Sequence, residues 1–191
     1  MHTHNLQDGD LVTFSAYTAL GVGINLATYG VPFFGASHIA IVGTYDRKKV
    51  LFESTTLNDV PCLIQGERVS GVQATDFDDR TRNYRGKVFH HPLSVPLTRV
   101  EKQRLNRFLL SHIGKDYDAI GAFRSGGIAW SWIESKLRRA DLTSLFCSEY
   151  CAAAHKKLNR LETKNVSRWS PNAFIRRQRR DKIVARKIRV H

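Results

Sequence analysis

No aspartate, glutamate, lysine or arginine occurs between Leu11 and Tyr45, and this uncharged stretch limits the possible fold more than any other feature. About 20 consecutive apolar residues can span a bilayer as a helix. Here helix breakers and polar side chains interrupt the stretch, namely Gly21, Gly23, Asn25, Gly30, Pro32, Gly35, Ser37 and His38. They exclude a spanning helix. We therefore expect strand and loop structure here, with an apolar substrate groove or contact with a membrane surface as the alternatives.

The composition is that of one globular domain. The 191 residues are 42% hydrophobic and 10% aromatic, which suffices for one core and is too little for two ordinary domains. The three cysteines form no disulfide framework, and the first residues do not resemble a signal peptide. We expect reduced thiols and a protein that is cytoplasmic or carried by a bacterial virus.

Basic residues gather in the C-terminal segment. Of the formal net charge of +13, the residues from Pro171 to His191 supply +7, with eight Lys and Arg against Asp181. An edge strand is expected in "DKIVARKIRV", because Lys and Arg discourage further pairing at a sheet edge. We divide the chain into a folded domain, residues 1–175, and a basic tail, residues 176–191. The tail is either a solvated face or a site for an anionic partner, such as nucleic acid or an anionic membrane.

The order of secondary structure predicts an α+β fold. Short apolar runs predict strands at Leu11–Ser15, His38–Thr44, Lys49–Ser54 and Gly86–His90, and the second and third flank the charged turn "YDRKK" as an antiparallel hairpin. Helices are predicted at Thr98–Ile113, Tyr117–Ala129 and about Ser144–Leu158. The first of these opens with a capping box formed by Thr98 and Glu101. We interpret "RWSPNAF" as a turn.

Cys147 is the first candidate for a chemical role. It lies near the start of a predicted helix rich in small residues, and a thiol near a helix N-terminus is favoured as the nucleophilic thiolate by the helix dipole. The alternative is a buried cysteine that packs as a small hydrophobic residue.

A thiolate nucleophile needs a base, and the base needs a group that orients it. His38 begins the apolar strand "HIAIVGT", and Glu53 lies near the end of "KVLFES". If these runs pair across the short turn at residues 45–48, His38 and Glu53 share one face of the sheet. The alternatives are a structural histidine and a solvated carboxylate.

Six short segments occur in one order: Gly9-Asp10-Leu11, "SHIAIV", "LFEST", "GKDYDA", "FCSEY" and "SPNAF". Over residues 8–175 this order resembles the circularly permuted branch of the NlpC-type papain-like cysteine peptidases, the YiiX/YaeF-like amidases. The resemblance implies a small antiparallel sheet packed against the helix that carries the nucleophile.

The resemblance also implies roles for individual residues. Cys147 would be the nucleophile, His38 the general base, Glu53 the residue that orients it, and Tyr117 a substrate or oxyanion contact. The backbone N–H of Cys147 is a second oxyanion candidate. The substrate would be an amide or an ester, in a peptide, a peptidoglycan peptide or a lipid-like molecule. The lecithin:retinol acyltransferase group shares the permuted order, which leaves acyl transfer open.

The sequence carries no motif for a metal or an organic cofactor. Cys147, Cys151 and His155 are candidates for a zinc site, because they are spaced four residues apart along the predicted helix. At about 1.5 Å per residue the outer two are about 12 Å apart, which is too far for both to bind one zinc ion. The competing function is a basic binding module that keeps the fold without catalysis.

Overall fold

The computed structural model describes residues 5–16, 35–55, 59–82, 84–115, 139–166 and 169–191. The predicted helix Tyr117–Ala129, Tyr117 itself and most of the uncharged stretch lie outside these ranges. Within them, no helix has the length and apolar composition needed to cross a bilayer.

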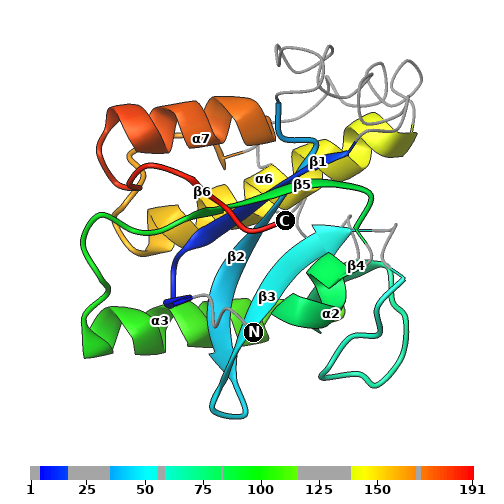
Figure 1. The fold of residues 1–191 in the computed structure, drawn as a ribbon. Coiled ribbons are helices and arrows are strands. Elements are labelled where there is room, and N and C mark those ends of the chain that lie inside the picture. The colour runs from blue at the N-terminus through cyan, green and yellow to red at the C-terminus, as the bar shows by residue number, and fades with distance from the viewer. Residues whose placement is uncertain (1–4, 17–34, 56–58, 83, 116–138, 167–168) are drawn as a thin grey trace, which may run out of the picture.

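The described residues form the predicted mixed α+β fold, and its antiparallel sheet has six strands, one of which, β4, was not predicted (Figure 1). The sheet order is β4-β3-β2-β1-β5-β6. The strands are β1 (Leu11–Ala16), β2 (His38–Tyr45), β3 (Lys48–Thr55), β4 (Gly71–Asp76), β5 (Gly86–His91) and β6 (Ile188–Arg189). The helices of the described part are α2 (Phe77–Arg82), α3 (Arg99–Leu110), α6 (Arg139–Lys157) and α7 (Pro171–Arg180).

The predicted hairpin of the second and third runs is confirmed. Strands β2 and β3 pair with Ile41 opposite Phe52 and Tyr45 opposite Lys48, which leaves the two-residue turn Asp46–Arg47. Both turn residues have positive φ, 45° and 61°, as in the type I′ turn whose twist matches that of the flanking strands. This register places His38 and Glu53 on the same face of the sheet.

The two faces of the sheet are covered unequally. Alternate residues such as Ile39 and Ile41 face a large core shared with α3, α6 and α7, because side chains of a strand alternate between faces. The opposite face, with Ala40 and Val42, packs against Phe77 of α2 in a smaller core. The sequence of a strand that is buried on both faces is a continuous apolar run, and β2 has this pattern.

Helix α3 begins with the capping box that the sequence predicts. The side-chain oxygen of Thr98 accepts from the N–H of Glu101, and the Glu101 carboxylate accepts from the N–H of Thr98 at 2.8 Å, so the capping box is present. Leu105 and Leu109 of α3 are buried, as is His112, which follows the helix.

The C-terminal segment differs from the prediction. "RWSPNAF" is not a turn, because Ser170 caps the N-terminus of α7 and Pro171 occupies its first turn, a position that suits its fixed φ. The predicted boundary between residues 175 and 176 falls inside this helix, which buries Ile175 on one side of the boundary and Gln178 on the other. The edge strand is present but comprises only Ile188–Arg189.

Candidate functional site

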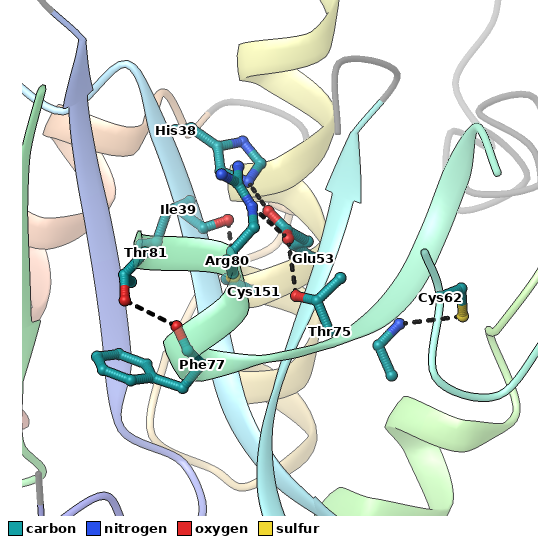
Figure 2. Close-up of polar contacts among 10 residues, drawn as sticks. His38, Ile39, Glu53, Cys62, Thr75, Phe77, Arg80, Thr81 and Cys151 are labelled. Carbon is teal, nitrogen blue, oxygen red and sulfur yellow. Dashed lines mark hydrogen bonds and ion pairs between the residues drawn. The ribbon is translucent and has the colours of Figure 1, made fainter. Parts of the chain in front are cut away.

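The carboxylate of Glu53 is the centre of a buried polar cluster (Figure 2). Its Oε2 lies 2.6 Å from Nε2 of His38. Its Oε1 accepts from the Thr75 hydroxyl at 3.1 Å and from Nε of Arg80 at 2.8 Å. The residues come from β2, β3, β4 and α2, so adjacent strands and the helix after β4 assemble the cluster. Both carboxylate oxygens therefore have fixed partners.

This cluster keeps Glu53 ionised. Burial alone would raise the pKa of the carboxyl, but the charge of Arg80 and the contact with His38 outweigh burial and lower the pKa from 4.5 to about 2. A carboxylate with two cationic partners is stable in a buried position only while those partners remain.

His38 interacts both with Glu53 and with the thiol of Cys147. Burial by itself would lower the pKa of His38, but the charge and hydrogen bond of Cys147, together with those of Glu53, raise the pKa from 6.5 to about 9. Glu53 contacts Nε2 of the His38 ring. The ring also packs against Phe14, with centroids 5.6 Å apart.

Cys147 is buried on α6 but does not begin that helix. The expected start at about Ser144 is wrong, because the helix-forming residues from Arg139 onward extend the helix upstream. The helix dipole acts within the first turn, so the expected effect of the dipole on the thiol does not apply to Cys147, which lies in the third turn. In a helix the N–H of Cys147 is directed to the carbonyl four residues earlier, which removes it as an oxyanion donor.

Arg80 and Thr75 belong to the cluster but were not predicted from the sequence. Arg80 lies in the charged segment "DFDDRTRNY", which resembles a solvated turn, yet its side chain is only 11% exposed. Helix α2 has six residues, too few to display a helical period of buried positions. Thr75 lies on β4, a strand that is absent from the predicted set. Tyr117 lies outside the described residues.

Asn172 lies in the "SPNAF" segment and contacts the backbone just before His38. Its Oδ1 accepts from the N–H of Ala36 at 2.7 Å, and its Nδ2 donates to the carbonyl of Ala36 at 3.2 Å. The next residue, Ser37, donates from its N–H and its hydroxyl to the carbonyl of Phe14. The backbone that leads into His38 is thus held from two directions.

No protein-family model matches this chain, and no curated protein matches it. Among solved structures it is similar to the crystal structure of metalloprotein yiiX from Escherichia coli O157:H7, DUF1105. The TM-score is 0.53 with 18% sequence identity, and the alignment covers 83% of this chain and 69% of that chain. Together with the sheet and helices described above, this likeness establishes that the chain has a YiiX-like fold.

Proposed function

We propose that this chain is a cysteine hydrolase of the permuted papain-like, NlpC type, which cleaves an amide or an ester through an acyl-enzyme on Cys147. One observation carries the proposal: His38 contacts the Glu53 carboxylate at 2.6 Å and also interacts with the Cys147 thiol. A nucleophile, a base in contact with it and a group that orients the base are the parts that nucleophilic catalysis needs.

The first half of the proposed reaction forms the acyl-enzyme. His38 takes the proton of Cys147, and the sulfur attacks the carbonyl carbon of the substrate. As the tetrahedral intermediate collapses, the protonated His38 gives its proton to the departing amine or alcohol, and a thioester remains on Cys147. Glu53 stabilises the imidazolium and orients it.

The second half regenerates the enzyme. His38 takes a proton from water, the hydroxide adds to the thioester carbonyl, and the thiolate leaves with the proton that His38 returns. The products are a carboxylic acid and the free thiol. A different acceptor in place of water would give acyl transfer from the same intermediate, so product analysis separates the two activities.

The similar protein from Escherichia coli is called a metalloprotein, which raises the question of whether the residues here could hold a metal ion. Both oxygens of Glu53 are engaged by His38, Thr75 and Arg80, so this carboxylate is not available as a ligand. The described residues also contain no group of three or more His, Cys, Asp or Glu side chains arranged to hold a metal ion. These residues do not fit a metal site, and no step above uses one.

The test is to label the protein with iodoacetamide from about pH 5 to about pH 9 and to measure intact mass. Because Cys147 is buried, the informative quantity is the pH dependence of the rate, not its absolute value. We expect one adduct, on Cys147, whose formation persists well below the pH at which an ordinary thiol ionises. Cys147→Ala should abolish it, and His38→Ala should slow it.

Cys151 provides the matched control, because it lies one helical turn from Cys147 and is equally buried. Burial raises the pKa of Cys151 well above its ordinary value, so Cys151→Ala should leave the labelling unchanged. An ordinary thiol profile that His38→Ala does not alter would refute the proposal. If the profile is as expected, the next step is to trap the acyl-enzyme with amide and ester substrates.

A second candidate function, anion binding by the basic tail, is favoured by one cluster of cations. Lys187 lies beside β5 with its Nζ 4.0 Å from the Phe89 ring centroid. Burial and the charges of Arg179 and Lys87 lower the pKa of Lys187. Three cations close enough to repel one another would gain from an anionic partner. Salt-dependent binding of a nucleic acid to wild type, and its loss in Lys187→Glu, tests this candidate.

A further inference from the structure

We infer that Arg80 is a positioning residue of the proposed hydrolase: its guanidinium keeps Glu53 ionised and turned towards His38, so that the carboxylate can stabilise the imidazolium formed when His38 takes the proton of Cys147. The inference rests on the proposed function. It adds a fourth side chain to the site, which acts through the carboxylate of Glu53.

The contacts of Glu53 are divided between its two oxygens. Nε of Arg80 is 2.8 Å from Oε1, and Nε2 of His38 is 2.6 Å from Oε2. Because Arg80 and the Thr75 hydroxyl occupy Oε1, the other oxygen is the one presented to the imidazole. A carboxylate fixed in this way cannot rotate to offer His38 a different geometry.

Charge balance gives Arg80 a second effect. With the thiol and the imidazole both neutral, the buried ion pair of Glu53 and Arg80 has no net charge. After proton transfer, the thiolate and imidazolium add one negative and one positive charge, so the set of four remains neutral. Without Arg80, one negative charge would be buried in excess, and the carboxyl would avoid this cost by taking a proton. A protonated Glu53 would no longer stabilise the imidazolium.

Arg80 is itself held in place by aromatic rings. Its Cζ lies 4.5 Å from the centroid of the Phe14 ring and 5.6 Å from that of Tyr84, and the two rings meet edge to face at 5.1 Å. The Phe14 ring also contacts His38. A cation that lies over two aromatic rings and pairs with a buried carboxylate has few other positions to adopt, which suits a residue that fixes another.

The test measures thiolate formation by ultraviolet absorbance as a function of pH, with the matching Cys147→Ala protein subtracted for each variant. This readout needs no reagent to reach the buried sulfur. We expect Arg80→Met to move the midpoint upward by about one pH unit, which is roughly a tenfold loss of thiolate at a pH below both midpoints. Arg82→Met is the control, because Arg82 lies on the same short helix and is exposed. It should leave the midpoint unchanged.

A double variant shows whether Arg80 acts through Glu53. In a Glu53→Gln background, Arg80→Met should cause no further shift, since the charge that Arg80 maintains is already absent. If Arg80→Met does not fold, Arg80→Lys carries the test, with a smaller upward shift expected. An unchanged or lowered midpoint in the folded variant would overturn the inference.

The two proposals can fail separately. A wild-type protein whose thiolate forms only at the pH of an ordinary thiol would refute the proposed hydrolase, and the role of Arg80 with it. A wild-type protein with a low midpoint, together with an Arg80 variant that matches it, would refute the role of Arg80 alone.

Discussion

The side-chain amide of Asn172 holds the backbone of Ala36 on both sides of the residue, accepting from its N–H and donating to its carbonyl. The two residues are 136 positions apart, and the contact joins the first turn of α7 to the chain just before His38. The C-terminal helix therefore helps to hold the backbone that leads into His38.

Asn172→Asp should weaken this link. The carboxylate keeps an acceptor for the N–H of Ala36 but sets a negative oxygen against its carbonyl, so we expect a loss of about 1–3 kcal/mol in the free energy of unfolding. The rate of Cys147 labelling should fall as well, because the segment before His38 is held less firmly. Urea unfolding and labelling of the same variant measure both effects. An unchanged labelling rate in a destabilised variant would limit Asn172 to a structural role.

Asp10→Asn should reduce stability without altering the reactivity of Cys147. The buried Asp10 carboxylate accepts from the N–H of Leu93 at 2.8 Å and of Gln7 at 2.9 Å, and it lies 2.7 Å from Nε2 of His90. These contacts join the start of β1 to the end of β5, away from the thiol. We expect a cost of about 1–3 kcal/mol in urea unfolding. A change in the pH profile of labelling would contradict this assignment.

Glu53 should make stability fall in acid. Its pKa is about 2 in the folded protein and 4.5 when unperturbed, so its contribution is fully present above pH 4.5 and is lost as the pH falls through about 2. Glu53→Gln removes this dependence. At neutral pH it should cost about 3–5 kcal/mol, because Arg80 is left buried without its partner. The difference between the unfolding curves of the two proteins, followed from neutral pH downward, isolates Glu53 from other carboxylates.

His38 should keep its proton up to a high pH, and its pKa should depend on the thiol of Cys147. A pKa of about 9 against 6.5 means that the proton on His38 stabilises the fold fully below pH 6.5, and that this contribution is lost as the pH rises through about 9. In Cys147→Ser the thiolate is absent, so the pKa of His38 should fall. NMR titration of the His38 imidazole in wild type and in Cys147→Ser measures its pKa in each protein. An identical titration in the two proteins would show that the thiol does not affect the histidine.

Lys187→Gln should stabilise the protein at low salt. The charges of Arg179 and Lys87 oppose that of Lys187, and removing one cation relieves their repulsion. Because salt screens exposed charges, the gain should shrink at high salt. Thermal unfolding of wild type and variant at two salt concentrations makes the comparison. A gain that does not depend on salt would point to a packing effect of the shorter side chain.

Much of the sheet and of the proposed site could be predicted because the responsible signals are local. The apolar run that begins at His38 and the short turn after Tyr45 determine a hairpin and its register, and the register brings Glu53 to the imidazole. The capping box at Thr98 likewise depends on two residues that are close in sequence.

The rest depends on contacts between distant segments. Strand β4 contains the buried polar residues Gln73 and Thr75, so its sequence lacks the apolar pattern of a buried strand. The burial of Arg80 depends on Glu53 and Phe14, which lie on strands distant in sequence, so the segment around Arg80 does not indicate it. The predicted start of α6 is too late because Ser144 resembles an N-cap, whereas the residues before it also favour a helix.

The position of β1 has a consequence for the order in which the protein assembles. Phe14 of β1 pairs with His38 on one side and with Val88 on the other. The second edge of β1 is therefore covered only after β5 has been made. Ile39 and Cys151 meet across 112 positions, and such distant contacts form slowly. During synthesis His38 is made long before Cys147. His38 and Cys147 can come together only after α6 has been made. The proposed thiol–imidazole pair is therefore absent from the growing chain until then.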